Sequence, residues 1–465
     1  MKQKKQFKRY IPALLMGELN KLTYGRKDDL YVIIDLIHRK EIYFKSDYQN
    51  KYGFTEIPLQ QFKELVPSCV HLKNGIDFLV DNKLLMKNNY YSIGVKSKSY
   101  RIPREYLGKT VPVIIEDVNI NKRISAQIVK NKRSRVKNLE FAKTAYFKTF
   151  KVDIDGATQL ITEKIVSEIK RLCFNLNINF SQSDIIDIIE CRKGHEKKRL
   201  TLLLQDEKKE IDNIIHRYMV YSTRINAIND GFLFFRRNKT NGRLDSNLTS
   251  LPSFLRPFLI SDEKLMNLDI KNSQPYFLYT LIWNNPDINQ DELKLYSELV
   301  INGKFYEYLI EQYKKHTGYD RYRNQMKDML FKIFYSKTTS YSNYKSFFGT
   351  IFPTIMEYIN QTNFDKHNTL SIQLQSKESF TILDIIMPLL EAQNIRPYTI
   401  HDSFICKESE AIQIKEIFNS KLIELYGRAP AMHLDFLIVE SEDDDIISSF
   451  DSLIEDIDSQ QETEN

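Results

Sequence analysis

Two aspartates lie far apart in the chain, each at the end of a short apolar run. Asp269 follows Met266-Asn-Leu, and Asp402 lies within Tyr398-Thr-Ile-His-Asp-Ser-Phe-Ile-Cys406. A carboxylate at such a position is usually an ordinary turn residue. Two of them, brought together from distant segments, can also bind a divalent cation, because carboxylate oxygens are hard ligands. The pattern therefore indicates Asp269 and Asp402 as candidate metal ligands.

Cations and aromatic side chains recur at every fourth position beyond residue 320. They are Arg323, Lys327, Phe331 and Tyr335, and no Gly or Pro interrupts the segment 320–342. This spacing places all four on one slowly drifting face of a helix. Two cations followed by two rings suit one task, in which the cations hold a triphosphate and the rings stack on a base or sugar. An amphipathic helix with snorkelling basic residues has the same pattern.

Both groups need elements that hold them in place. Apolar or β-branched residues flank the polar triplet 401–403, which predicts a β-hairpin whose arms pack inward and whose turn presents Asp402. Apolar stripes predict long helices between 140 and 230. The stripes are Ile161, Ile165, Ile169 and Leu172; Ile185, Ile188 and Ile189; and Ile211, Ile214, Ile215 and Tyr218. They are most simply core, and this region holds no catalytic constellation.

A further segment, Asn241-Gly-Arg-Leu-Asp-Ser246, precedes these stretches. Taken in order, the four stretches between 235 and 410 resemble motifs of the family A polymerases, which include bacterial repair DNA polymerases, and of the related single-subunit RNA polymerases. In this resemblance Asp269 corresponds to motif A, the helix with Lys327 to motif B, and His401-Asp402 to motif C. The preceding helices lie where the family has its thumb.

The resemblance implies an α+β, right-hand polymerase fold with a helical thumb, an antiparallel-sheet palm and helical fingers. It implies two Mg²⁺ ions bound by Asp269 and Asp402, with Mn²⁺ able to substitute, and a DNA primer–template and dNTPs as partners. Nucleotide transfer would then be two-metal phosphoryl chemistry, with Lys327 as proton donor to the leaving group. The other implied roles are substrate binding by Arg323, Lys327, Phe331, Tyr335 and Gln274, and nucleic-acid binding by Arg243, His401 and Gln375 or Gln373.

Two departures from the family concern residues beside the motifs. Ser403 follows Asp402, as in single-subunit RNA polymerases, whereas the DNA polymerases have Glu there. Ser336 follows Tyr335, where the family has Gly. The first departure favours an RNA polymerase or primase that uses NTPs as an alternative to a DNA polymerase.

A third departure lies in motif A. Without a gap, Gln274 occupies the position of the family's sugar-gating Glu, whereas a shift by two aligns Ser273-Gln274 with the family's Ser-Gln and brings Tyr276 near. The choice between deoxynucleotides and ribonucleotides therefore stays open. A third alternative is a DNA-binding replication initiator with an inactive palm.

Residues 1–110 are expected to form a unit of their own. The pattern predicts helices over 57–65 and 69–81, followed by β-rich arms over 84–92 and 96–102. This order is typical of a winged helix, in which the second helix enters the major groove and the hairpin contacts the DNA backbone. Such a module would suit a small polymerase of a phage or mobile element. The cations expected to contact the backbone are Lys96, Lys98 and Arg101.

The distribution of charge favours a polyanionic partner. The 465-residue chain has a formal charge of +6, but 440–465 contains eleven acidic residues and no Lys or Arg, so the remainder carries +17. An excess of positive charge of this size is typical of nucleic-acid binding. The segment 111–140 is expected to be a basic linker. Its cations are Lys122, Arg123, Lys130, Lys132, Arg133, Arg135 and Lys137.

Length and a hydrophobic content of 42% allow two or three domains with proper cores. The expected division is an N-terminal module (1–110), a basic linker (111–140), a thumb-like region (141–235), a palm and fingers domain (236–439) and a disordered acidic tail (440–465). No apolar run approaches a membrane span, and the basic N-terminus lacks the apolar core of a signal peptide. We therefore expect a cytoplasmic protein without a membrane partner.

Overall fold

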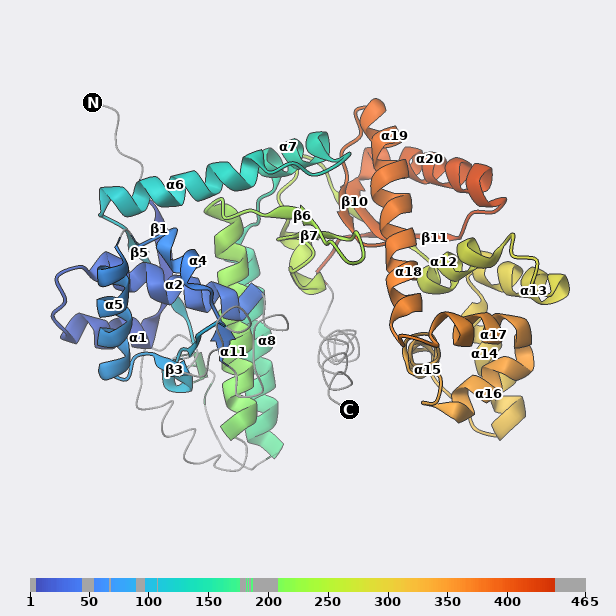
Figure 1. Cartoon of the computed structure of the whole chain (residues 1–465), viewed down its shortest axis with the longest axis horizontal. Helices are drawn as coiled ribbons and strands as arrows, with labels where there is room; N and C mark the ends of the chain where they lie inside the picture. The colour runs from blue at the N-terminus through green and yellow to red at the C-terminus, as the bar shows by residue number, and fades with distance from the viewer. Residues whose placement is uncertain are drawn as a thin grey trace.

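The computed structural model describes residues 6–43, 54–66, 68–88, 97–106, 108–175, 181, 183, 185, 186 and 208–439. Lys96 and the acidic segment 440–465 lie outside these residues. Two hydrophobic cores organise the described chain, one from Phe7 to Ile124 and the other from Val136 to Met432. Figure 1 shows the corresponding two bodies, with helix α6 (Val118–Arg133) running between them. Within the described ranges, no helix is long and apolar enough to cross a membrane.

The N-terminal body is a small α+β unit. Its elements are β1 (Lys8–Pro12), α1 (Ala13–Lys21), α2 (Lys27–Tyr43), β2 (Thr55–Glu56), α4 (Leu59–Lys63), α5 (Cys69–Asp81), β3 (Met86–Asn88), β4 (Ser99–Arg101), a 3-10 turn (Arg104–Tyr106) and β5 (Thr110–Ile114). An antiparallel sheet has the order β2-β4-β3, and β1 pairs with β5. The helix expected over 69–81 is α5, where the Ser68 hydroxyl accepts hydrogen bonds from the backbone of Val70 and His71. Such an N-cap satisfies amides that the helix itself leaves unpaired.

In the structure, the N-terminal body extends beyond residue 110, where the sequence predicts its boundary. β5 pairs with β1, and Ile120 and Ile124 on α6 pack into the first core. The segment expected to be a linker over 111–140 therefore contains the end of a strand and a long helix. The many cations in this segment made its apolar helical pattern hard to recognise in the sequence. Every residue from Val129 to Arg135 is exposed, so the chain between the two cores is the second half of α6.

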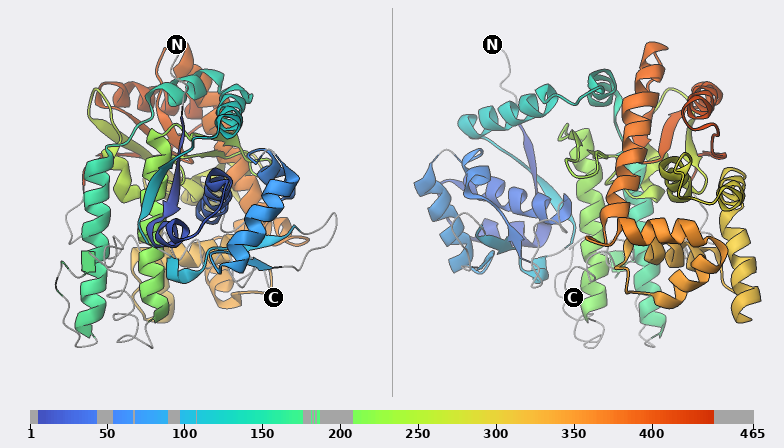
Figure 2. Two further views of the ribbon diagram at one scale, coloured as in Figure 1. Left: turned by 90° about the vertical axis from the view of Figure 1, so that its left-hand side faces the viewer. Right: turned by 45° about the vertical axis from the view of Figure 1, so that its right-hand side comes forward.

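In the segment expected to be the thumb, the described residues form α7 (Glu140–Thr149), α8 (Ile154–Asn175) and α11 (Lys208–Asn229). α8 and α11 lie side by side (Figures 1 and 2). The stripe predicted on α8 is buried at Ile161, Ile165 and Ile169, whereas Ile188 and Ile189 lie outside the described residues. α11 also contacts the N-terminal body, where the buried His38 ring is 3.1 Å from the Thr223 hydroxyl.

The second body is built on a four-stranded antiparallel sheet in the order β11-β8-β10-β9. Its strands are β8 (Leu265–Ile270), β9 (Tyr398–Ile400), β10 (Ser403–Lys407) and β11 (Met432–Phe436). Alternate residues of β8, namely Met266, Leu268 and Ile270, are buried, while those between them are half-buried. This two-residue period places one face of β8 in the core and leaves the other face, which carries Asp269, only half-buried. Helix α20 (Glu408–Tyr426) covers the core face, with Phe418 against Phe404.

Two short strands and a helical layer complete this body. They are β6 (Phe235–Arg237), β7 (Leu244–Ser246), a 3-10 helix (Ser253–Phe258), α12 (Ser273–Ile282), α13 (Gln290–Ile301), α14 (Phe305–Thr317), α15 (Arg323–Tyr335), α16 (Ser342–Ile351), α17 (Pro353–Thr362), α18 (Thr369–Ser379), a π-helix (Phe380–Ile386) and α19 (Met387–Ala392). α18, the π-helix and α19 form one long rod beside the sheet (Figure 1). The mixture of helices with small antiparallel sheets agrees with the expected α+β class.

Candidate active site

The strand register brings the two predicted carboxylates together. Asp269 on β8 is paired with Ser403 on β10, and Asp402 is the residue just before that pair. Ile400 pairs with Ser403, so His401 and Asp402 form a two-residue hairpin loop, as the sequence predicts. His401 has φ +53°, and tight hairpin turns require a positive φ at their first central residue. Asp269 itself lies on the half-buried face of β8, away from the core.

The environment of Asp269 is electrostatically unusual. Its pKa is raised to about 7, first by burial and then by the charge of Asp402, while Lys327 counteracts the rise. A like charge close by disfavours ionisation, and an opposite charge favours it. These opposing effects mean that Asp402 and Lys327 both lie near the Asp269 carboxyl group, although they come from different elements.

Helix α15 carries the four residues predicted to share one face. It begins at Arg323 and ends at Tyr335, and its buried residues, on other faces, are Met326, Met329, Leu330, Ile333 and Phe334. Arg323 and Lys327 are exposed, whereas Phe331 and Tyr335 are half-buried. The two rings stack with centroids 5.6 Å apart, and the Lys327 Nζ lies 5.5 Å from the Phe331 centroid. Arg323 instead pairs with Glu307 at 3.1 Å.

Tyr335 is tied to the helix that follows β8. Its hydroxyl donates a 2.7 Å hydrogen bond to Gln274 Oε1, and Gln274 Nε2 donates to Glu378 Oε2 at 2.9 Å. Tyr276, the other residue left open by the sequence, is buried, and its hydroxyl donates to the Arg428 carbonyl at 3.0 Å. Of the two residues that the sequence leaves open, Gln274 contacts Tyr335 and Tyr276 contacts Arg428 instead.

The loop between β6 and β7 contacts α18. Arg243 donates from Nε and Nη2 to the two oxygens of Glu378, both at 3.0 Å. Asn241 Nδ2 donates to Gln375 Oε1 at 2.8 Å. Of the two glutamines that the sequence leaves open, Gln375 thus lies at the site, whereas Gln373 is exposed.

The donor set fits a divalent cation of the magnesium type. Within the described ranges, no group of three or more His, Cys, Asp or Glu side chains is placed to hold a metal. Mg²⁺ needs no such group, since it keeps several waters and is bound through one or two carboxylates plus substrate phosphates. The repulsion that raises the Asp269 pKa is also the repulsion that a cation between Asp269 and Asp402 would remove.

Two charged residues of the site were missed by sequence reasoning. Glu378 is fully buried, and Arg256 contributes to the electrostatics of both Asp269 and His401. The pKa of His401 is lowered to about 3, first by burial and then by Arg243 and Arg256. The available signals were a carboxylate three residues beyond Gln375 on one helix and a lone cation in the apolar segment 251–259. Two residues that the sequence predicts to bind nucleic acid, Lys98 and Arg101, lie in the N-terminal body and not among the residues of this site.

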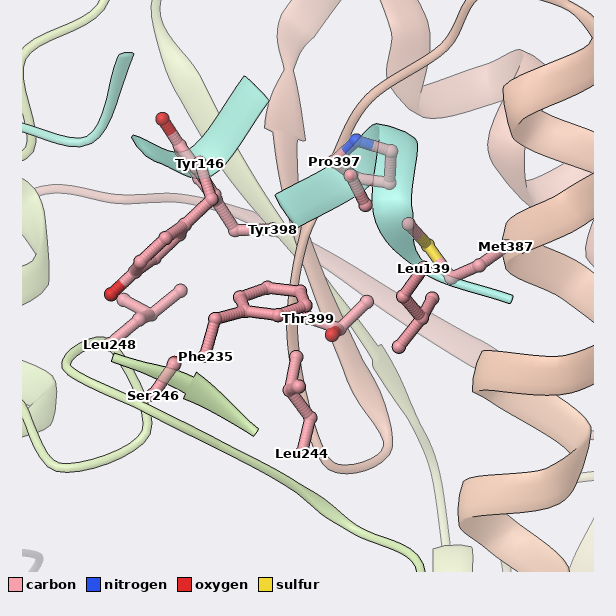
Figure 3. Close-up of a pocket in the computed structure, with 11 residues that line it drawn as sticks. Leu139, Tyr146, Phe235, Leu244, Ser246, Leu248, Met387, Pro397, Tyr398 and Thr399 are labelled. Atoms are coloured by element: carbon pink, nitrogen blue, oxygen red, sulfur yellow. The ribbon is translucent and has the colours of Figure 1, made fainter. Parts of the chain in front are cut away.

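An apolar pocket lies among α7, β6, β7 and β9, and neither Asp269 nor Asp402 lines it (Figure 3). Tyr146 of α7, Phe235 of β6, Leu248, and Tyr398 and Thr399 of β9 are among the residues that line it, and none of its lining residues is charged. The Tyr146 hydroxyl donates to Asn247 Oδ1 at 3.2 Å. The side chains around the pocket thus pack the β6–β7 segment against β9, and they include no carboxylate, imidazole or amine.

Taken together, the second body carries paired carboxylates on an antiparallel sheet, opposed by a helix of cations and rings. No protein-family model and no curated protein matches the chain. Among solved structures it is similar to the POL domain of Pol1 from M. smegmatis in complex with DNA primer-template and dNTP, at 11% identity and a TM-score of 0.45 over 69% of this chain and 73% of that chain. A similarity this distant does not by itself establish a shared function.

Proposed function

We propose that the chain is a template-directed DNA polymerase that resembles family A and adds dNTPs to a primer 3′-hydroxyl. The observation that carries this proposal is the convergence of Asp269 on β8 and Asp402 in the β9–β10 turn on a face opposed by Lys327 of α15. Phosphoryl transfer needs little covalent chemistry from the protein, because positioning and charge neutralisation supply most of the catalysis. Paired carboxylates and a facing cation supply both.

Each residue then has a role that follows from its position. Asp269 and Asp402 would hold Mg²⁺, or Mn²⁺ in its place. Lys327 binds the triphosphate and gives a proton to the leaving pyrophosphate, while Arg323 at the exposed start of α15 meets the outer phosphates. Tyr335 and Phe331 pack on the new base pair and sugar. When bound, the metal supplies charge neutralisation and a more acidic 3′-hydroxyl.

Nucleic acid would reach the site over residues from several elements. Arg243 and Gln375 lie together at the β6–β7 loop, and His401 lies in the hairpin turn, from which they would contact the primer–template. The exposed second half of α6 carries Lys130, Lys132 and Arg133, whose charge suits a phosphate backbone.

A second candidate is an RNA polymerase or primase that uses NTPs. The observation in its favour is that an amide, Gln274, hydrogen-bonds Tyr335 at the sugar-gating position, where the resemblance leads us to expect a carboxylate. Ser403 after Asp402 agrees with this alternative. The two candidates share the site and differ in the sugar accepted and in whether synthesis needs a primer.

We also propose that the N-terminal body binds duplex DNA as a winged helix. Its order α2, β2, α4, α5, β3, β4 and its sheet order β2-β4-β3 support the proposal. Lys73 and Asn74 of α5 are exposed, as a helix that enters the major groove requires. Lys98 lies just before β4, and Arg101 is its last residue. A polymerase with such a module suits replication of a phage or mobile element. Footprinting that finds no preferred sequence for this body would remove the targeting role.

Primer extension on a DNA template with Mg²⁺ tests the main proposal. Wild type is compared with Asp402→Ala, and Asp435→Ala serves as the matched control, because Asp435 is an exposed carboxylate on the same sheet. Extension with dNTPs that is lost in Asp402→Ala and kept in Asp435→Ala is the expected result. Extension with NTPs alone would favour the second candidate.

Failure of the folded wild type to extend with either nucleotide would contradict both polymerase candidates. DNA binding that persists unchanged in Asp402→Ala would then favour a replication initiator with an inactive palm.

A further inference from the structure

One buried carboxylate connects three separate segments of the site. Glu378 on α18 has no exposed surface, yet it accepts hydrogen bonds from Arg243 and from Gln274. Gln274 in turn accepts from the Tyr335 hydroxyl. The loop after β6, the helix after β8 and the end of α15 are thereby joined through a single side chain.

Three N–H groups, two from Arg243 and one from Gln274 Nε2, donate to Glu378, so its carboxyl group is the acceptor in this network. Burial and then the charge of Asp402 raise the pKa of Glu378 to about 7, while Arg243 and Gln274 counteract the rise. Gln274 therefore turns its Nε2 toward Glu378 and its Oε1 toward the Tyr335 hydroxyl. A glutamate at position 274 would place two carboxylates against each other in a buried setting, which is strongly unfavourable. Gln274 and Glu378 are therefore a complementary pair, with the negative charge on α18 and not on α12.

Glu378 also fixes the plane of Arg243. The two bonds use Nε and Nη2, both at 3.0 Å, which is the bidentate geometry that gives an arginine one orientation. Among the hydrogen bonds of the described residues, none uses Nη1 of Arg243, so these two N–H groups remain for a substrate. Arg243 contributes to the lowered pKa of His401, and Asp402 contributes to the raised pKa of Glu378. The ion pair between Arg243 and Glu378 therefore lies near the hairpin turn.

The backbone around this ion pair is shaped to hold it. Gly242 has φ +71°, and a Cβ there would come within 2.7 Å of Ser379 Oγ. The Ser379 hydroxyl donates to the Asn241 carbonyl at 2.8 Å. The π-helix that follows Ser379 then shifts the register, so that Asp384, five residues on, reaches Arg237 at 2.7 Å. π-helical turns inside α-helices are frequent at functional sites.

We propose that Glu378 is a positioning residue, which holds Arg243 toward the primer end and, through Gln274, holds Tyr335 toward the incoming nucleotide. This inference rests on the proposed polymerase function and extends it, because it makes primer contact and nucleotide contact depend on one carboxylate. A change at Glu378 then disturbs both contacts together.

A charge swap between Glu378 and Gln274 tests this role. Gln274→Glu alone removes the amide donor and adds a facing carboxylate, and Glu378→Gln alone removes the charged partner of Arg243. Each is expected to lower kcat/KM for nucleotide addition by about 100-fold, the scale of a small misplacement at a reacting centre. In the double variant the new amide on α18 can donate to the new carboxylate on α12 and accept from Arg243 Nε, while the second bond to Arg243, from Nη2, is lost. The double variant is expected to recover to within about 10-fold of wild type.

The matched control is Glu391→Gln on α19. Glu391 accepts a hydrogen bond from the Ala142 amide and lies outside the site, and glutamine keeps an oxygen that can accept this bond, so the variant should leave kcat/KM unchanged. A double variant as impaired as the worse single one, or single variants altered only in melting temperature, would overturn the positioning role while wild-type extension upholds the polymerase. An inactive wild type would overturn both.

Discussion

Asp269 and Ser403 are directly opposite each other on β8 and β10, and this pairing sets Asp402 beside the Asp269 carboxylate. A slip of one residue would turn Asp269 toward the core, because successive side chains of a strand point to opposite faces. The register is held by Phe404, which pairs with Leu268 and packs on Phe418 of α20. The core face of the sheet thus fixes the geometry of the other face.

Replacing Asp269 by Asn should stabilise the protein while it abolishes extension. The folded-state pKa of about 7 lies above the ordinary 3.8, so folding takes up a proton and this group's contribution to stability falls as pH rises across that interval. At about pH 8 the Asn variant should gain about 1–3 kcal/mol in unfolding free energy, and at about pH 4 the gain should vanish. Urea denaturation without metal at both pH values measures it. A loss of stability at the higher pH would contradict the expectation.

Lys327→Ala should raise the KM for the nucleotide and lower kcat, together by about 10- to 1,000-fold in kcat/KM, because a cation facing the triphosphate is lost. Lys332→Ala is the matched control on the same helix. Lys332 pairs with Asp328 at 2.7 Å and is expected to change kcat/KM less than twofold. Steady-state primer extension measures both variants, and equal effects would argue against Lys327 as a substrate contact.

Tyr335→Phe removes the 2.7 Å hydrogen bond to Gln274 and keeps the stacked ring against Phe331. With its anchor gone the ring can shift, so the ratio of kcat/KM for dNTP over NTP should fall by about 10-fold while the preferred nucleotide is still incorporated. Competition between a dNTP and the matching NTP at one template position gives the ratio directly. An unchanged ratio would show that this hydrogen bond has no part in sugar selection.

His401 carries a left-handed φ of +53°, which glycine adopts without cost. His401→Gly should therefore destabilise the fold less than His401→Ala, by about 1 kcal/mol in unfolding free energy. Chemical denaturation compares the variants. An alanine variant as stable as the glycine one would contradict the strained turn.

The pKa of His401 is lowered to about 3. Protonation of this ring should therefore leave no inflection in the rate profile of wild type between about pH 5 and 8.

Lys132→Gln/Arg133→Gln on the exposed part of α6 should weaken DNA binding and flatten its salt dependence. The slope of log K against log salt should fall by about 0.9 for each phosphate contact removed. Lys314→Gln/Lys315→Gln provides a control of equal charge, since both lysines pair with carboxylates on α14 and its end. Fluorescence anisotropy at several salt concentrations distinguishes the pairs. Identical slopes for both would leave α6 without a backbone contact.

Local pattern predicted much of this chain. The helix from Cys69 to Asp81, the helix that begins at Arg323 and the hairpin with His401 and Asp402 at its turn follow from periodicity, capping and turn preference, which act between near neighbours in sequence. Asp269, Asp402 and Lys327 were likewise named from residue type and spacing.

Tertiary structure alone decided the rest. The sequence left open whether Gln274 or Tyr276 lies near Tyr335, and the structure shows that Tyr335 hydrogen-bonds Gln274. It gave no reason to single out Glu378, because a glutamate on a helix is normally solvated; only packing of α18 against the β6–β7 loop removes its water and supplies Arg243. The boundary on α6 was hidden for a similar reason, since burial of Ile120 and Ile124 depends on a strand pair formed by the two ends of the N-terminal body. Desolvation and long-range pairing are properties of the folded chain.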